Sequence, residues 1–158
     1  MKTLIIYATK NGATKKIAEA IAGYMGNATL HDINSAGSVS IGSYDCIILG
    51  SPLTAGQVHK SIKSFAVKHT NELQNKKLGI FLSGLQADGE DEYLKQNFSK
   101  ELLDKADAKA CLGGIFDPEK CGFFARTIIK AVSKLDTYTS TIDEGKIVLF
   151  AKALLSEN

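Results

Sequence analysis

Short apolar runs alternate with segments of helical periodicity along the 158-residue chain, and this alternation constrains the fold more than any other feature. Five such runs predict β-strands at Thr3–Tyr7, Ala28–Ile33, Tyr44–Gly50, Leu78–Ser83 and Ala108–Phe116. Three of them are almost continuously apolar, which is typical of strands covered by helices on both faces. Strands that alternate with helices favour right-handed crossovers and a parallel sheet. The sequence therefore predicts a single α/β domain over residues 1–158.

The segments between these runs place apolar residues at helical spacing. The recurring positions are Ile17, Ile21 and Met25, then Ile62, Phe65 and Ala66, then Leu94, Phe98 and Leu102. The last helix has a start signal of its own, because Thr141 and Glu144 fit a capping box. The stretch Asn34–Ser43 is too short and too rich in glycine for a crossover helix, so it predicts a loop.

The segment of residues 117–140 is longer than a crossover connection needs, and it predicts a helical insertion in the domain. Its middle, "FFARTIIKAVSKL", is amphipathic: Phe124 and Ile128 follow one face, while Arg126 and Lys130 follow another. Between residues 119 and 135 there are four basic residues and one acidic residue. Such a helix can lie on an anionic bilayer, which would give peripheral membrane contact through residues 120–135. Packing of its apolar face over the sheet or a site is an equally sufficient explanation.

Composition excludes several classes of protein. A hydrophobic content of 44% and a charged content of 23% are typical of a soluble globular protein, and no apolar run reaches the length of about 18 residues that a membrane span needs. The start does not resemble a signal peptide, so we expect a cytoplasmic protein. A net charge of +2 is too small to indicate nucleic-acid binding. The spacing of the three cysteines is typical of neither a disulfide framework nor a metal site. We expect Cys46 and Cys111 to be buried in strands. No catalytic triad can be assembled from the sequence.

The stretch "YATKNGAT" joins the first predicted strand to the first predicted helix. In an open parallel sheet, ligands bind beyond the carboxyl ends of the strands. A helix that begins near Ala13 points unpaired amides and its positive dipole end into this loop, and Gly12 allows close approach. These features predict an anion cradle for a phosphate, made of Thr9, Lys10, Asn11, Gly12, Ala13 and Thr14. The alternative is a polar turn in which Asn11 caps the helix and Lys10 is merely solvated.

Two further loops lie at the same predicted edge. The first is "GSPLTAGQVHK", in which Pro52 is expected to end its strand and His59 to open a helix. The second is "SGLQADGEDE", whose acidic residues suit the first turn of a helix. Both loops are small enough for backbone amides to reach a flat heterocycle. The residues expected to line it are Pro52, Leu53, Thr54, Ala55 and Gly56 on one side, and Ser83, Gly84, Leu85 and Gln86 on the other.

The loop between the first strand and helix resembles the [TS]-x-[TN]-G-x-[TS] phosphate loop of flavodoxins, because Thr9–Thr14 fill it position by position. Nearly the whole chain resembles the flavodoxin-like superfamily. More narrowly, it is similar to the branch that contains menaquinone-dependent protoporphyrinogen IX dehydrogenase. The segments that carry this resemblance are "MKTLIIYATKNGATKKIAEAI", "YDCIILGSPLTAGQVHKSIKSFAVKH" and "GGIFDPEKCGFFARTIIKAVSKL".

The resemblance implies a flavodoxin-like three-layer sandwich with a parallel sheet of order 2-1-3-4-5 and FMN held non-covalently at the three loops. It further implies an FMN-dependent oxidoreductase of the protoporphyrinogen dehydrogenase type, with a small molecule or a quinone as redox partner. Two alternatives stay open: a non-enzymatic electron carrier that meets a redox protein, and a phosphate-binding regulatory module without flavin. Ordinary carriers place aromatic residues in these loops, whereas neither loop has one here and the chain has no tryptophan.

Overall fold

A central parallel sheet organises the molecule, which is described here by a computed structural model over residues 1–85 and 89–156. Its five parallel strands are β1 (Thr3–Tyr7), β2 (Ala28–Asp32), β3 (Cys46–Thr54), β5 (Lys77–Ser83) and β6 (Ala108–Cys111). They lie in the order β2-β1-β3-β5-β6, which is 2-1-3-4-5 when the parallel strands alone are numbered. This order confirms the predicted topology. The predicted count of five is wrong by one, because β4 (Gln57–Val58) adds a short antiparallel strand beside the end of β3.

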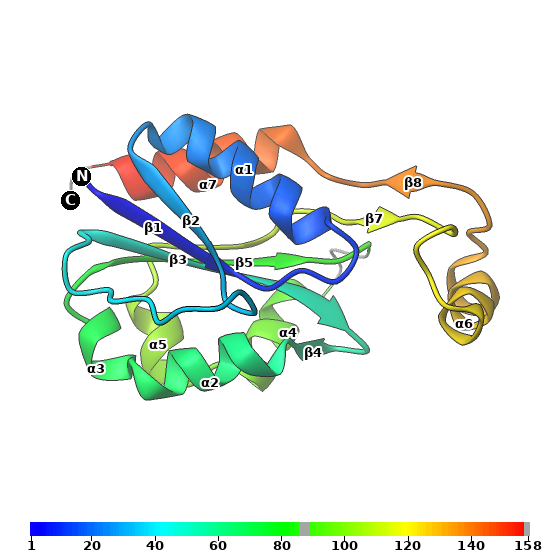
Figure 1. The fold of residues 1–158 in the computed structure, drawn as a ribbon, viewed down its shortest axis with the longest axis horizontal. Coiled ribbons are helices and arrows are strands. Elements are labelled where there is room, and N and C mark those ends of the chain that lie inside the picture. Colours follow the sequence, from blue (N-terminus) through cyan, green and yellow to red (C-terminus); the bar gives the residue numbers. More distant parts are fainter. Residues whose placement is uncertain (86–88, 157–158) are drawn as a thin grey trace.

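Helices cover both faces of this sheet (Figure 1). Seven helices are described: α1 (Ala13–Met25), α2 (Lys60–Lys68), α3 (Thr70–Leu73), α4 (Glu90–Asn97), α5 (Lys100–Lys105), α6 (Phe123–Ser133) and α7 (Glu144–Leu155). α1 and α7 cover the face of the sheet that carries Ile5 and Ile48, and α2, α4 and α5 cover the face that carries Ile6. Neighbouring residues of one strand point to opposite faces, so both faces need apolar side chains. The three-layer sandwich is therefore confirmed.

Strand β3 runs past Pro52, whereas the sequence predicted that Pro52 would end it. The backbone carbonyl of Gly50 faces β1, because it accepts a hydrogen bond from the amide of Ala8. Pro52 lies two residues further along and faces the same side, but β1 has already ended at Tyr7, opposite Gly50. The N–H that proline lacks would be the next donor towards β1, so the ladder between β1 and β3 ends here. The strand β3 continues because its other edge still pairs with β5, where Pro52 lies opposite Ser83, and because its last two residues pair with β4.

Other boundaries also differ from the prediction. The stripe of Leu94, Phe98 and Leu102 belongs to two helices, because the hydroxyl of Ser99 caps a new helix by accepting from the amide of Leu102. The predicted strand Ala108–Phe116 breaks into β6 and β7 (Ile115–Phe116). The cap of α7 is Asp143, whose carboxylate accepts from the amide of Lys146, rather than the predicted Thr141. The loop at residues 34–43 contains no helix or strand, as predicted.

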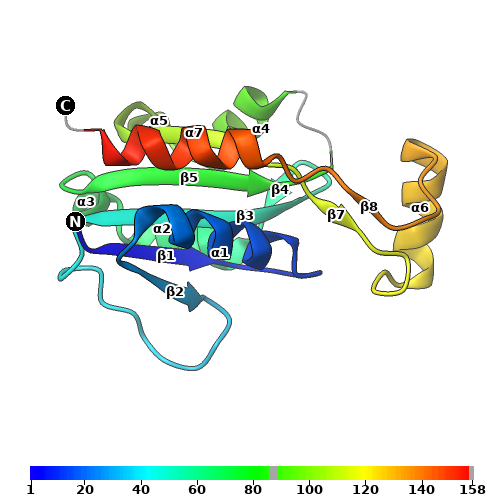
Figure 2. The same cartoon turned by 90° about the horizontal axis from the view of Figure 1, so that it is seen from above.

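An arm projects from the sandwich between β6 and α7. In it, β7 pairs in antiparallel fashion with β8 (Thr139–Ser140), with Phe116 opposite Thr139. The ribbon leads to α6, which confirms the helix predicted in this region. Both views show α6 held away from the three layers (Figures 1 and 2). No described helix is long and apolar enough to cross a membrane.

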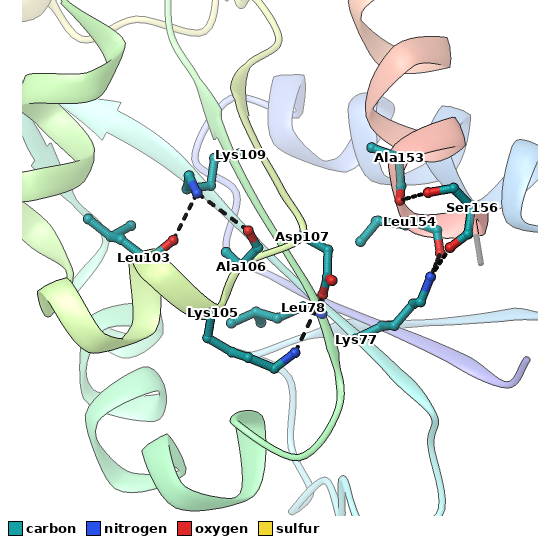
Figure 3. A network of polar contacts seen from close by, with 10 residues as sticks. All are labelled: Lys77, Leu78, Leu103, Lys105, Ala106, Asp107, Lys109, Ala153, Leu154 and Ser156. Carbon is teal, nitrogen blue, oxygen red and sulfur yellow. Dashed lines mark hydrogen bonds and ion pairs between the residues drawn. The ribbon is translucent and has the colours of Figure 1, made fainter. Parts of the chain in front are cut away.

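Polar contacts close the amino-terminal edge of the sheet (Figure 3). The ammonium group of Lys77 donates to the carbonyl oxygens of Leu154, at 3.2 Å, and Ser156, which satisfies groups at the end of α7. The carboxylate of Asp107 accepts from the amide of Leu78 at 2.9 Å. These bonds fasten α7 and the start of β6 to β5 at this edge. The opposite, carboxyl-terminal edge is formed by the loops that the sequence singles out.

Candidate functional site

The carboxyl ends of β1, β3 and β5 are neighbours in the sheet. Tyr7 at the end of β1 lies opposite Gly50, and Pro52 in β3 lies opposite Ser83 at the end of β5. The three loops singled out in the sequence therefore leave the sheet side by side, at its right-hand edge in Figure 1. In the sheet, β1 has β2 on one side and β3 on the other. The strand order reverses at β1, so this edge includes the topological switch point where open α/β sheets bind ligands.

The loop after β1 is shaped by Gly12. This residue is the N-cap of α1 and has a φ of 86°, a left-handed conformation that favours glycine. Its amide donates to the hydroxyl of Thr9 at 3.1 Å, and no side chain caps the helix. Asn11 therefore does not serve as the cap that the polar-turn alternative required. A β-carbon on Gly12 would meet no atom within 4 Å, so the space above the loop is open.

The first turn of α1 leaves hydrogen-bond donors unused. Within the described part of the chain, neither the amides of Ala13 and Thr14 nor the hydroxyl of Thr14 has a hydrogen-bond partner. The side chain of Thr14 is only 1% exposed. No acidic residue lies in this turn, whereas Lys15 and Lys16 do. Unpaired amides, a positive helix end and the absence of acidic side chains together suit an anion such as a phosphate.

The remaining two cradle residues lie at the rim of this loop. Lys10 is exposed. Asn11 is half-buried, and its side-chain nitrogen lies 4.0 Å from the sulfur of Cys121, at the base of the arm. A thiol is a weak hydrogen-bond partner, so the contact is loose. It nevertheless places the arm beside the loop after β1, which the sequence did not indicate.

The loop after β3 is a tight hairpin. Thr54 pairs with Gln57, and the turn between them consists of Ala55, with a φ of 49°, and Gly56, with a φ of 76°. Two successive positive φ values are typical of the type I′ turn that joins twisted strands. Alanine rarely adopts this conformation, so Ala55 is a point of backbone strain. Of the predicted wall residues, Pro52, Leu53 and Gly56 are half-buried, whereas Thr54 and Ala55 are exposed.

Asn97 fastens this hairpin to α4, and the sequence analysis missed it. Its side chain is 4% exposed, accepts from the amide of Val58 at 3.1 Å, and donates to the carbonyls of Gly56 and Tyr93 at 2.9 and 2.8 Å. All of its bonds reach backbone groups, so they fix the path of the hairpin. The available signal was a polar residue beside Phe98 on an otherwise apolar stripe.

Tyr93 supplies the aromatic ring that the loops themselves lack. A β-carbon on Gly56 would lie 3.5 Å from this ring, and one on Gly89 would lie 3.8 Å from it. The ring therefore stands between the hairpin after β3 and the loop after β5. The sequence predicted no aromatic residue at this site because neither loop has one before its next helix, whereas Tyr93 lies inside α4.

The loop after β5 is held by the backbone that follows β6. The amide of Gly84 donates to the carbonyl of Gly113 at 3.0 Å, and the hydroxyl of Thr141 accepts from the amide of Gly114 at 3.1 Å. A β-carbon on Gly114 would come within 2.8 Å of the Gly84 backbone, so only glycine fits there. Ser83 is buried, and Gly84 and Leu85 are half-buried. The predicted residue Gln86 lies outside the described residues.

Other candidate groups have structural roles. The ring nitrogen Nδ1 of His59 accepts from the amide of Ser61 at 3.3 Å, which makes His59 the N-cap of α2. The carboxylate of Glu90 accepts from the amide of Cys111 at 2.9 Å and so joins the start of α4 to β6. No group of three or more metal-ligating side chains occurs among residues 1–85 and 89–156.

Three titratable side chains of the sheet, those of Tyr7, Cys46 and Cys111, have a raised pKa. Burial raises the pKa of the Cys46 thiol to about 11, and it also raises the pKa of Cys111. A protonated thiol is a poor nucleophile, so neither cysteine is suited to covalent catalysis. Burial raises the pKa of Tyr7 as well, with contributions from Asp32 and Glu19. The carboxyl-terminal edge of the sheet offers hydrogen-bond donors and a positive helix end at the start of α1.

Comparison with known proteins places this arrangement in a family. An uncharacterized protein of Methanocaldococcus jannaschii is 38% identical over 98% of this chain and 99% of its own length. The Escherichia coli protoporphyrinogen IX dehydrogenase [quinone] is 23% identical over 85% of this chain and 80% of its own. The crystal structure of a flavodoxin, WrbA-like protein from Agrobacterium tumefaciens shares the fold, with a TM-score of 0.59 and 21% identity over 98% and 95% of the two chains. A family model described as a flavodoxin domain matches residues 4–143, and the chain therefore belongs to that family.

Proposed function

We propose that this chain binds FMN non-covalently at the carboxyl-terminal edge of its sheet and acts as a redox protein. The observation that carries the proposal is the first turn of α1, where two amides and the hydroxyl of Thr14 lack partners within the described residues. This turn lies at the switch point between β1 and β3, where flavodoxins bind FMN. Membership of the flavodoxin domain family supports the same cofactor.

Each loop has a distinct part in this proposal. Thr9–Thr14 bind the phosphate group, the hairpin at Pro52–Gly56 lies on one side of the ring, and Ser83–Gln86 lie on the other. Bound FMN supplies the capacity to accept and release electrons. The protein positions it: α1 neutralises part of the phosphate charge, and Asn97 holds the hairpin in place.

Absorbance of the purified protein tests this assignment. We expect a flavin spectrum, and we expect Thr14→Asp to abolish it, because the new carboxylate would repel the phosphate. Thr29→Asp is the matched control, since it adds the same charge at an exposed position on β2. A Thr14→Asp protein that keeps FMN would refute the assignment of the loop.

We further propose that the protein is an FMN-dependent oxidoreductase of the protoporphyrinogen dehydrogenase type, with a quinone as acceptor. The distant similarity to the Escherichia coli enzyme supports this activity. A second candidate is a non-enzymatic carrier that passes electrons to a redox protein. The observation that favours an enzyme is the arm, because it is rooted beside both Asn11 and Gly84 and so lies next to the proposed site.

Removal of the arm separates these two candidates. Phe116 and Thr139 face each other across the ribbon, so deletion of residues 118–137 leaves Asp117 and Tyr138 as a two-residue turn. In the shortened chain, Tyr138→Gly places glycine in that turn, because glycine adopts the positive φ that a two-residue turn needs. We expect the full chain to oxidise protoporphyrinogen in the presence of menaquinone, and the deleted chain to keep FMN but lose this turnover. A flavin-loaded full chain without turnover would favour the carrier.

A further inference from the structure

Three large apolar side chains of helix α6 are exposed, and two of them have the highest exposed fractions of any large apolar residue in the described structure. Phe123 is 79% exposed, Phe124 is 81% exposed and Ile128 is 62% exposed. The two phenylalanine rings meet edge to face, with their centres 5.8 Å apart. Residues 123–128 of the helix are all exposed, because the ribbon of β7 and β8 holds α6 away from the sandwich (Figures 1 and 2). The packing alternative considered for this helix is therefore not what the structure shows.

Basic and apolar side chains follow different faces of α6, except that Phe123 lies on the side of Lys130, seven positions away. Phe124 and Ile128 are four positions apart and share one face, whereas Arg126 and Lys130 share another. No acidic residue occurs within the helix, and neither Arg126 nor Lys130 forms an ion pair with any described residue. Apolar and unneutralised basic faces thus lie side by side along one exposed helix.

We propose that α6 binds the surface of an anionic lipid bilayer. Its apolar face enters the boundary between headgroups and acyl chains, and Arg126 and Lys130 bind lipid phosphates. Charge complementarity favours lipid as the occupant, because neither base is paired with an acidic side chain of the described residues. A second copy of the chain is a poorer fit. One face of an 11-residue helix offers little of the roughly 800 Å² per partner that a standard protein interface buries.

This proposal goes beyond FMN binding and does not depend on it. A single short helix gives weak and reversible membrane binding. The arm is rooted at the carboxyl-terminal edge of the sheet, where Thr141 bonds to Gly114 and Cys121 lies near Asn11. A bilayer bound at α6 would therefore adjoin the edge that holds the three loops.

A tryptophan reporter tests the contact directly, because the chain has no tryptophan of its own. We expect the emission of Phe124→Trp to shift to the blue with vesicles of phosphatidylcholine and phosphatidylglycerol, and to shift much less with phosphatidylcholine alone. Leu149→Trp is the matched control, since Leu149 is 67% exposed on α7, and it should not respond. No response of Phe124→Trp to either vesicle would overturn the proposal, as would an equal response of both variants.

Charge removal and oligomeric state complete the test. Arg126→Gln combined with Lys130→Gln should weaken sedimentation with anionic vesicles on the order of tenfold. Lys68→Gln combined with Lys152→Gln, at exposed positions of α2 and α7, should leave it unchanged. Light scattering without lipid distinguishes the competing occupant. A dimer that Phe124→Ser and Ile128→Ser together convert to a monomer would place a second copy on this face and refute the proposal.

Discussion

Thr14 is the residue of the first turn of α1 that bears most directly on a phosphate site. Its side chain is 1% exposed and makes no hydrogen bond within the described structure. Its oxygen keeps some contact with solvent, because Thr3 Oγ1 and not Thr14 is the fully buried side-chain oxygen without a partner among the described residues. A phosphate oxygen at the start of α1 could accept a hydrogen bond from the Thr14 hydroxyl.

Replacement of Thr14 by valine should separate binding from folding. The shape is kept and the unpaired hydroxyl is removed, so we expect the apoprotein to be as stable as the parent or slightly more stable. The affinity for FMN should fall about 10- to 100-fold, because a hydrogen bond to a charged group contributes about 1.5–3 kcal/mol. Urea unfolding and flavin fluorescence titration measure the two effects. Unchanged affinity would show that Thr14 does not bind the phosphate.

Ala55 should tolerate glycine with a gain in stability. A left-handed conformation costs a residue with a β-carbon about 1–2 kcal/mol, and glycine loses about 0.5–1 kcal/mol through its freer unfolded chain. We therefore expect Ala55→Gly to raise the free energy of unfolding by roughly 0.5–1 kcal/mol. Ala153→Gly, at an exposed position of α7, is the control and should lower it by about 1 kcal/mol. The same sign for both variants would contradict the strain at Ala55.

The thiols should differ sharply in reactivity. Cys46 and Cys111 are buried with raised pKa values, whereas Cys121 is half-buried in the arm. At pH 8 we expect Ellman's reagent to react rapidly with Cys121 and to reach the other two only after denaturation. Rapid reaction of all three in the native protein would contradict the burial.

The stability of the protein should also fall at alkaline pH because of Cys46. Its pKa is about 11 when folded and 9.0 as a reference for the unfolded chain, so the unfolded state loses its proton first. The free energy of unfolding then decreases as the pH rises from 9 towards 11. Cys46→Ala should reduce this slope in urea titrations at several pH values, and an unaltered slope would exclude Cys46 as its source.

At the scale of elements, Asn97 makes α4 and the β3–β4 hairpin behave as one unit. Asn97→Ala would leave the amide of Val58 and the carbonyl of Gly56 without partners, at a cost of about 2–4 kcal/mol. We also expect weaker FMN binding, because the hairpin loses its fixed position. Gln96→Ala, its exposed neighbour, should change stability by no more than about 0.5 kcal/mol. Equal effects of the two variants would show that the link is unimportant.

Element types followed from local patterns, whereas several boundaries depended on distant partners. The apolar run at Thr3–Tyr7 and the stripe after Ala13 predicted β1 and α1 closely, because a strand or helix in the core must present apolar faces. The extension of β3 past Pro52 could not be predicted, since it depends on pairing with β5 and β4. The predicted capping box at Thr141 was wrong, because the hydroxyl of Thr141 accepts from the amide of Gly114, which is 27 residues away in the sequence.

At the scale of the whole molecule, the sequence predicted which loops meet but not what holds them. Parallel strand order places the ends of β1, β3 and β5 together, and this follows from the alternation of strands and helices. The link from Asn97 to Gly56 spans 41 residues and has no local signature. The projection of α6 was equally hidden, because amphipathic spacing identifies an apolar face and not what covers it.

Comparison of FMN with riboflavin tests the central claim most directly. The two ligands share the ring and differ in the phosphate, so their affinities isolate the loop at Thr9–Thr14. Fluorescence titration of the apoprotein should show that FMN binds about 100-fold or more tightly than riboflavin, because several charge-assisted hydrogen bonds are lost with the phosphate. Equal affinities, or no binding of either flavin, would contradict a phosphate site at the start of α1.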